Sequence, residues 1–414
     1  MLGLSLALEP LFGRAIGAKD FKSMGAWLQR SLIILLLADV PISVLWLNAE
    51  AILLACAQPK EIAAIAGLFL RYQLPQNSLM AIVMPLRLFA RSQGHTTPIA
   101  MGASRGFLLQ IPLNYLFMDY IRLGVVGPAI AGYCFEIVHI VFLVSHGAYN
   151  QTFAPCWPGW SPRVWAVGWG TFLRLGVPCC AALWLQVWSF ETLVLMGGWL
   201  PNPAYNIAAL AIAFYINAVL SGITFGVATA SSTRIAMALG ANKPQIAALA
   251  SRAFLLVGLG LGAVIALALA AFRNPLIGLL TSEPEMVRRA SKILLVLALY
   301  AVLDSPQQVA QGILQGSARP HVVFLIVLIT QYPIGIVASF VLGFKERPGV
   351  SGLWMGMVIA DVAQLGAEVT LVWLTNWEIQ AANTGTQLAR SLEIVYAGEN
   401  ISYASVAMKQ TYKP

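Results

Sequence analysis

Apolar residues run along this chain in long stretches, and short segments between them collect its polar and charged side chains. Ten stretches are long enough to cross a bilayer as helices, which takes about 20 mostly apolar residues. They span residues 30–50, 66–90, 98–118, 124–147, 171–197, 205–230, 252–280, 291–315, 320–343 and 351–375. A short apolar stretch, residues 1–9, precedes them, and the polar residues 376–414 predict a largely disordered cytoplasmic tail.

The composition agrees with a multi-pass membrane protein. The chain is 59% hydrophobic and 10% charged, whereas soluble domains carry about 25% charged residues. Its net charge of +8 comes from Lys and Arg placed singly between apolar stretches, as in cytoplasmic loop anchors, so we expect no nucleic-acid partner. The five cysteines lack metal-site spacing, and nucleotide-binding and hydrolase motifs are absent from the sequence. We therefore predict no metal, no cofactor and no enzyme activity.

The sequence repeats itself. Four segments of the first half recur in order in the second, at an offset of about 220–226 residues: 17–30 with 240–252, 52–62 with 277–287, 91–98 with 314–321, and 123–132 with 348–357. A duplicated fold explains this order, with both copies pointing the same way.

The two copies are unequal at their beginnings. The second copy has two stretches, 171–197 and 205–230, before its repeated loop, but the first has only residues 1–9. A complete molecule of this design would have about twelve helices. We expect this chain to lack about 55–60 of its residues. The alternative is a native protein with ten and a half helices.

Four segments in order resemble the multidrug and toxic compound extrusion (MATE) transporters, especially the eukaryotic branch. They read LALEPLFGRAIGAKDF, PCCAALWLQVWSFETLVLMGGWLPNP, SSTRIAMALGANKPQIA and VLDSPQQVAQGILQGSARP, and the resemblance covers about residues 4–375. It implies an all-α membrane protein of two pseudo-symmetric six-helix bundles, residues 1–164 and 165–375, with the first one or two helices missing. It also implies efflux by alternating access, in which protons, or less often sodium ions, enter while an organic cation, xenobiotic or metabolite leaves.

Acidic residues deep in apolar stretches are the candidates for ion coupling, because a charge there costs about 2.5–3.5 kcal/mol. A buried carboxyl is readily held protonated, and a cationic substrate can compete with the proton for it. Six acids qualify by position: Asp39, Glu136, Glu191, Asp304, Asp361 and Glu368.

Glu191 is the first choice for the proton- and cation-binding carboxylate. Trp184 and Trp188 lie near it in sequence, and aromatic rings beside a carboxylate suit an organic cation. The resembled family has two acids in the pattern Glu-x-Trp-x-aromatic-Glu. Here Gln186 replaces the first, which leaves Glu191 alone. The alternative is a neutral acid bonded to a backbone carbonyl.

Asp304 is the second choice, since it matches the family's acidic position in its tenth helix. Residues at helical spacing after it predict a cavity lining, namely Gln307, Gln308 and Gln311. Asp304 can instead cap a proline-containing helix start. Tyr215 and Asn217 are weaker lining candidates that can simply bridge helices.

Two of the other acids have structural explanations. Asp39 fits a contact between helices near Pro41, and Glu136 shares a helix face with His139, which allows the two to pair. Rival functions are a truncated, non-transporting relative and a lipid-linked sugar flippase, although a flippase predicts a basic cavity. We expect a monomer in the plasma membrane or the vacuolar membrane that binds a small molecule and protons or sodium.

Overall fold

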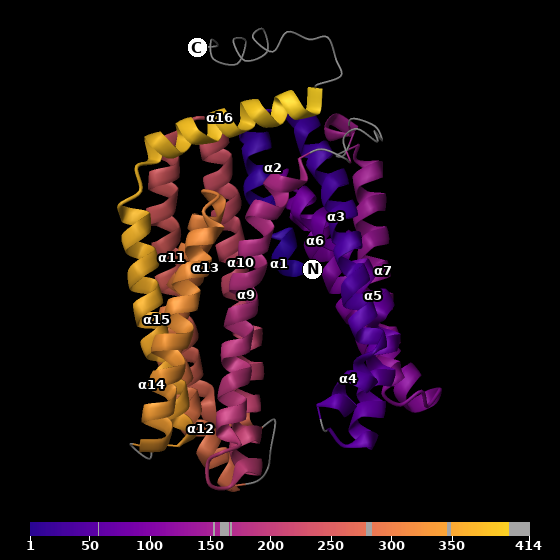
Figure 1. Cartoon of the computed structure of the whole chain (residues 1–414), viewed down its shortest axis with the longest axis vertical. Helices are drawn as coiled ribbons and strands as arrows, with labels where there is room; N and C mark the ends of the chain where they lie inside the picture. The colour runs from indigo at the N-terminus through magenta and orange to yellow at the C-terminus, as the bar shows by residue number, and fades with distance from the viewer. Residues whose placement is uncertain are drawn as a thin grey trace. The chain divides into compact units, whose positions relative to one another are not determined.

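The computed structural model describes residues 1–56, 58–151, 154–157, 165, 168–278, 284–345 and 349–396, and every regular element within them is helical. The chain divides into two compact units, which are described separately (Figure 1). Unit 1 comprises Met1–Leu173 and Thr386–Pro414, and unit 2 comprises Arg174–Gly385.

The helices of unit 1 are short at the beginning of the chain and longer afterwards. They are α1 (Leu2–Ser5), α2 (Leu8–Gly17), α3 (Phe21–Leu47), α4 (Ala49–Ala55), α5 (Lys60–Ser92), α6 (Thr97–Tyr115), the π-helix η1 (Leu116–Tyr120), α7 (Val126–Tyr149) and the 3₁₀ turn η2 (Ala154–Cys156).

Unit 2 is built from long helices, one of which is interrupted by π-helical turns. They are α9 (Trp169–Gly197), which begins before the unit boundary, α10 (Pro203–Gly240), α11 (Pro244–Gly278), α12 (Pro284–Gly316), α13 (Pro320–Ile329), η3 (Thr330–Ile336), α14 (Val337–Phe340), η4 (Val341–Lys345) and α15 (Val350–Trp373). Helix α16 (Trp377–Tyr396) starts in unit 2 and ends in unit 1.

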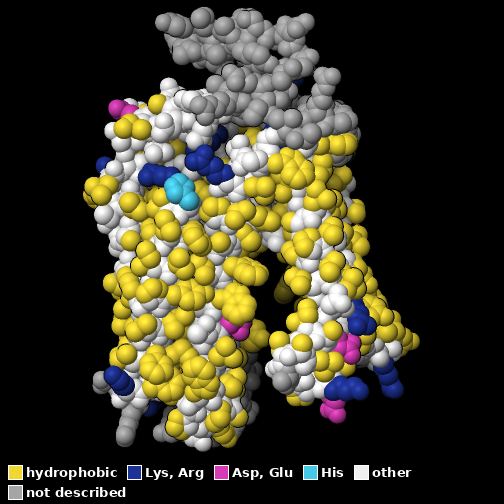
Figure 2. Space-filling view, in the orientation of Figure 1, with side chains coloured by type: hydrophobic (Ala, Val, Ile, Leu, Met, Phe, Trp, Pro, Cys, Tyr) yellow, Lys and Arg dark blue, Asp and Glu magenta, His cyan; other side chains and the backbone are white. Residues whose placement is uncertain are grey.

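The predicted helical membrane architecture is confirmed. In the described residues, eight helices are long and apolar enough to cross a bilayer. The stretches expected at 66–90 and 98–118 also lie in helices, α5 and α6 with η1, which are not among these eight. Figure 2 shows apolar side chains over much of the outer surface of the helices, as lipid contact requires.

The expected disordered tail differs from the structure at its beginning. Residues 377–396 form α16, which opens with Asn376 accepting hydrogen bonds from the amides of Glu378 and Ile379, both at 3.1 Å. Such side-chain bonds satisfy amide groups that the first turn of a helix leaves unpaired. Residues 397–414 of the predicted tail lie outside the described residues.

The repeated loops share a backbone conformation, which supports the duplication. Lys19 and Asn242 occupy matching positions and have left-handed φ angles of 58° and 54°. In both loops the amide of the next residue donates to a carbonyl five residues back, at 2.8 and 2.9 Å. Gly124 and Gly349 form another matching pair, with φ of 56° and 62°, a region that glycine enters without strain.

Candidate functional site

A group of polar side chains, all buried except the half-buried Gln308, lies inside unit 2, where α12 and α15 pack together and η3 packs on α15. We call it the acidic cluster. Its members are Asp304, Gln307 and Gln308 of α12, Gln331 of η3, and Asp361, Gln364 and Glu368 of α15. On α15 the three polar positions follow at i, i+3 and i+7, so they share one helix face.

Asp304 lies in the interior of α12 and is 8% exposed. Its carboxylate accepts hydrogen bonds from Gln308 Nε2 at 2.7 Å and from the Tyr300 hydroxyl at 3.4 Å. The alternative role as a helix cap is wrong, because α12 begins at Pro284 and Asp304 lies within it, not at its start. Asp304 is therefore held inside the bundle by donors from its own helix and by Ser221 of α10.

Tyr300 contacts the Asp304 carboxylate through its hydroxyl and other aromatic side chains through its ring. Its ring packs edge-on against Trp354 and Phe190, with centroids 5.7 and 6.2 Å apart, while its hydroxyl also interacts with Asp361. Asp361 is 1% exposed and accepts a 3.4 Å hydrogen bond from Gln331 through Oδ1. Among the described residues, its Oδ2 has no hydrogen-bond partner.

Glu368 forms the other end of the cluster, about 10 Å along α15 from Asp361 at 1.5 Å per residue. It is fully buried. Gln307 donates to both carboxylate oxygens at 3.3 Å, and Gln364 donates to one of them at 3.1 Å. Gln364 in turn accepts from Gln331 at 2.9 Å, so the amides connect the two acids of α15.

Among the described residues, the cluster has no balancing positive charge. In the described part of the chain, the two ion pairs within 4.0 Å are Arg71–Glu50 and Arg91–Glu9, and both lie in unit 1. The donors that reach the three cluster carboxyls are amides and hydroxyls. A buried, ionised carboxylate without a cationic partner is strongly disfavoured, so the chemistry of the cluster is suited to holding protons or a small cation.

Helix α9 adds two of its polar side chains to the edge of this cluster. Gln186, at the position where the resembled family has its first acid, donates to Gln311 Oε1 at 3.5 Å. The Ser189 hydroxyl donates to Gln331 Oε1 at 3.4 Å. The structure thus brings three of the predicted glutamines, Gln307, Gln308 and Gln311, into one largely buried region with Asp304 and Gln186.

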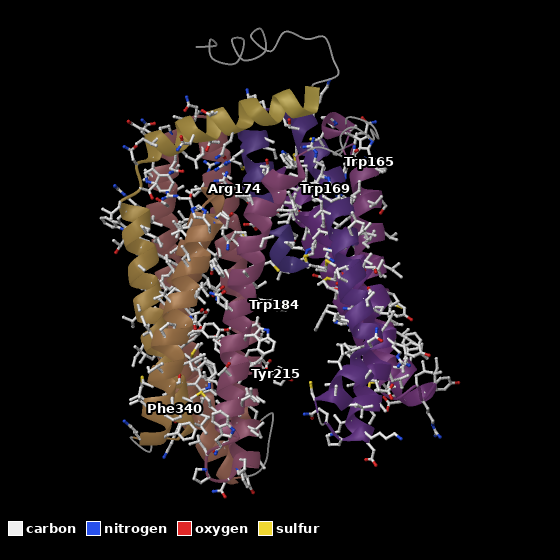
Figure 3. The ribbon with its side chains drawn as sticks, in the orientation of Figure 1. Trp165, Trp169, Arg174, Trp184, Tyr215 and Phe340 are labelled. Carbon is white, nitrogen blue, oxygen red and sulfur yellow. The ribbon has the colours of Figure 1, made fainter. Side chains whose placement is uncertain are left out.

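Glu191 has different surroundings. It is exposed, and within the described residues its carboxylate makes no hydrogen bond or ion pair, including the predicted alternative bond to a backbone carbonyl. Trp184 and Trp188 are 66% and 55% exposed, with ring centroids 6.4 Å apart. Figure 3 shows Trp184 and Tyr215 projecting from the surface of unit 2, whereas Asn217 is buried. Glu191 and these rings form an open, partly aromatic surface that is distinct from the acidic cluster.

The strongest omission from the predicted site is the inward face of α15. Asp361 and Glu368 are deep acids by position but are not among the predicted coupling residues, and the predicted site does not include Gln331, Gln364 or Tyr300. The i, i+3, i+7 spacing of polar residues in an apolar helix was the signal that could have found this face.

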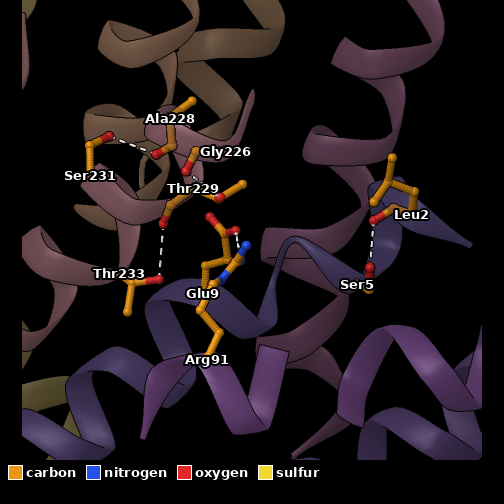
Figure 4. A network of polar contacts seen from close by, with 9 residues as sticks. All are labelled: Leu2, Ser5, Glu9, Arg91, Gly226, Ala228, Thr229, Ser231 and Thr233. Carbon is orange, nitrogen blue, oxygen red and sulfur yellow. Dashed lines mark hydrogen bonds and ion pairs between the residues drawn. The ribbon is translucent and has the colours of Figure 1, made fainter. Parts of the chain in front are cut away.

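Some other buried polar groups are satisfied by nearby groups. On α10, Thr229, Ser231 and Thr233 donate to carbonyls of their own helix at 2.7–3.0 Å (Figure 4). In unit 1, Arg91 of α5 pairs with Glu9 of α2 at 2.5 Å, as Figure 4 also shows.

Asp39 lies at a contact between α3 and α5. It accepts hydrogen bonds from Asn77 and from the Ser78 hydroxyl. The predicted helix–helix contact at Asp39 is therefore confirmed.

Comparison with known proteins finds relatives that belong to one family. The MatE family model matches residues 1–116 and 178–341. Protein DETOXIFICATION 49 of Arabidopsis thaliana is 33% identical over 391 residues, covering 94% of this chain and 78% of that protein. The eukaryotic MATE transporter AtDTX14 has a similar structure, with a TM-score of 0.87, 28% identity, and coverage of 92% of this chain and 85% of that one. The Vibrio cholerae MATE transporter VcmN shares the fold at a TM-score of 0.81 and 18% identity, covering 91% of this chain and 86% of that one.

Proposed function

Because this chain belongs to the MATE family of secondary transporters, we propose that it is an antiporter that admits protons while exporting an organic cation. The proposal assigns proton binding to the acidic cluster of unit 2, with Asp304 as its principal carrier. It assigns contact with the cation to Glu191 and the neighbouring rings of Trp184 and Trp188.

The observation that carries this proposal is the set of three buried carboxyls that lack a cationic partner in the described residues. Burial favours the neutral form of each carboxyl, and a carboxylate becomes neutral when it binds a proton. Asp304 is the least enclosed of the three, at 8% exposed against 1% for Asp361 and 0% for Glu368. It is therefore the one best placed to exchange a proton with water.

Protons suit the cluster better than sodium ions do. Sodium requires several oxygen ligands directed at one point, but the cluster oxygens of Asp304 and Glu368 already accept amide or hydroxyl hydrogens. A proton needs only one oxygen lone pair, and the surrounding glutamines can rotate to donate to or accept from the protonated acid.

The exposed surface around Glu191 supports the choice of an organic cation. The faces of Trp184 and Trp188 attract a cation, and the Glu191 carboxylate is free of competing partners in the described residues. Coupling then follows if protonation of the cluster changes the affinity of this surface for the cation. We further propose a monomer in the plasma or vacuolar membrane, where a proton gradient is available.

The test is counter-transport by the purified protein in liposomes. A pH gradient should drive movement of a fluorescent organic cation, such as ethidium, and a sodium gradient at constant pH should not. Asp304→Asn should abolish the response to the pH gradient. Asp39→Asn is the matched control, since it removes a buried carboxyl that is fully bonded in unit 1, and it should retain most of the response.

Three results would oppose this function. Transport driven by a sodium gradient alone would show that sodium, and not the proton, is the coupling ion. Transbilayer movement of a fluorescent lipid-linked sugar, with none of ethidium, would favour the flippase. No transport of either by a well-folded protein would favour a non-transporting role.

A further inference from the structure

Helix α7 of unit 1 carries a buried acid and a buried histidine that the proposed function does not use. Glu136 and His139 are 5% and 0% exposed and lie at i and i+3, on one face of the helix. Among the described residues, Glu136 Oε2 and both ring nitrogens of His139 have no hydrogen-bond partner. Two neighbouring side chains thus have unused donors and acceptors inside one bundle.

The histidine is closely enclosed by α6. A Cβ atom added at Gly102 would come within 2.9 Å of His139 Cδ2 and 3.3 Å of the Phe142 ring. The ring of Phe135, one residue before Glu136, packs edge-on against the imidazole with centroids 6.0 Å apart. The imidazole is therefore held in place, and solvent does not reach its nitrogens.

Arg87 of α5 is the charged group that acts on both side chains. It forms no ion pair within 4.0 Å in the described part of the chain. Arg91, one turn further along α5, repels Arg87 but is itself paired with Glu9 at 2.5 Å.

The remaining charged groups near α7 are directed elsewhere. Arg105 of α6 lies over the Phe142 ring, 4.2 Å from its centroid. Asp119 of η1 is exposed. Among the described residues, Arg87 is the charged group that acts on Glu136. His139 follows Glu136 by about one turn, on the same face of α7.

We propose that Glu136 binds and releases a proton inside unit 1, facing Arg87 when ionised and donating to a ring nitrogen of His139 when protonated. The proton adds to a carboxylate oxygen, and no other covalent bond forms or breaks. The neutral imidazole supplies an acceptor lone pair for the new hydroxyl. Each protonation state of Glu136 then has its own stabilising partner.

This site is separate from the acidic cluster, because it lies in the other unit and uses α5 and α7. It does not rest on the proposed antiport, and it would give unit 1 a proton site of its own. A side chain with two partners selected by one proton is the kind of element that changes conformation with pH.

The experiment is infrared difference spectroscopy of the full chain in lipid nanodiscs, between acid and alkaline pH. The carboxylic C=O stretch of protonated Glu136 should contribute one component to the difference spectrum. Glu136→Gln should remove that component. His139→Leu should move it to higher frequency, since the hydroxyl loses its acceptor. Asp39→Asn should leave it unchanged.

Uniform ¹³C labelling of glutamate provides a check without any substitution, because it must shift the component to lower frequency. Circular dichroism and gel filtration confirm that each variant is folded. Persistence of the component in Glu136→Gln, absence of an isotope shift, or an unmoved component in His139→Leu would each overturn the proposal. None of these measurements requires transport, so failure of the antiport would not produce the same result.

Discussion

Gln331 of η3 and Asp361 of α15 are joined by a hydrogen bond, with Nε2 3.4 Å from Oδ1. The same amide nitrogen donates to Gln364 at 2.9 Å, and the amide oxygen accepts from Ser189 of α9 at 3.4 Å. One side chain from a π-helical segment therefore connects three elements of unit 2. π-Helical turns often occur at functional positions, and here the turn contributes the amide that orders the acidic cluster.

Gln331→Leu should destabilise unit 2 by about 1–3 kcal/mol, because buried acceptors on Asp361 and Gln364 lose their donor. Denaturant unfolding in detergent, followed by tryptophan fluorescence, measures the change. Tyr332→Phe is the neighbouring control, since the Tyr332 hydroxyl donates to one carbonyl, that of Leu185, at 3.3 Å. It should cost about 0.5–1.5 kcal/mol, and equal losses for the two variants would contradict the central position of Gln331.

Two glycines of α15 should respond oppositely to alanine. A Cβ atom at Gly356 would clash with the backbone of Ser339 in α14, whereas at Gly366 it meets nothing within 4 Å. Gly356→Ala should therefore destabilise the protein by about 1–3 kcal/mol through overpacking. Gly366→Ala should stabilise it by about 0.5–1 kcal/mol, because alanine restricts the unfolded chain.

The same unfolding assay compares the two alanine variants directly. If Gly356→Ala is as stable as Gly366→Ala, the close approach of α14 to α15 is incorrect.

The positions of helices were largely predictable from the sequence. Apolar stretches place them because lipid-facing and buried residues are both apolar in a membrane protein. Helix starts are also visible, since Pro203 and Pro320 stand in the first turns of α10 and α13, where the missing amide hydrogen costs nothing. The matching left-handed turns at Lys19 and Asn242 follow from the sequence repeat.

The inward faces of the helices were less predictable. Because apolar residues surround a membrane helix on all sides, the sequence shows only a weak difference between its lipid side and its packed side. Glu191 and Asp361 are both acids in apolar stretches, yet the first is exposed and the second is buried. Gln331 enters the cluster through a π-helical turn, whose altered spacing is not encoded in a 3.6-residue pattern.

Asp20 should make stability depend on pH at the start of α3. It accepts a hydrogen bond from the Ser23 amide at 3.2 Å as the helix cap. Burial raises the pKa of Asp20 above its ordinary value of 3.8, although the bond from Ser23 and the charge of Lys22 act in the opposite direction. The folded state therefore binds this proton more tightly than the unfolded state does. Stability falls as the pH rises from the ordinary pKa of Asp20 through its raised pKa in the folded state.

Asp20→Asn keeps a good cap without the buried charge. It should be at least as stable as the wild type at neutral pH, and the difference should vanish as the pH falls below about 4. Asp20→Ala should be about 1 kcal/mol less stable than Asp20→Asn at every pH, because neither variant titrates at this position and the alanine lacks the cap. Thermal unfolding across a pH series checks both variants. If the asparagine variant gains stability over the wild type as the pH falls, the prediction is contradicted.

Substitutions at Gln186 and Glu191 can test whether the position of the carboxyl group on α9 matters. The Gln186 amide lies 3.5 Å from Gln311 Oε1, at the edge of the acidic cluster, whereas Glu191 is exposed and unpaired in the described residues. Under the proposed function, Glu191→Gln should weaken transport of an organic cation by at least tenfold, while the protein folds normally, because the exposed carboxylate is not part of the packed interior. The loss corresponds to about 1.4 kcal/mol or more of binding or coupling energy.

Gln186→Glu alone should retain transport but shift its pH dependence, because the new carboxyl joins a region that already holds buried acids and Gln311 can rotate to donate to it. The double variant, Gln186→Glu with Glu191→Gln, separates the two positions. If the cation must meet a carboxylate beside Trp184 and Trp188, an acid at position 186 cannot restore transport, and the double variant should remain as impaired as Glu191→Gln. Recovery to near the wild-type rate in the liposome assay would show instead that the two positions are equivalent and that the exposed placement of Glu191 is not what selects the cation.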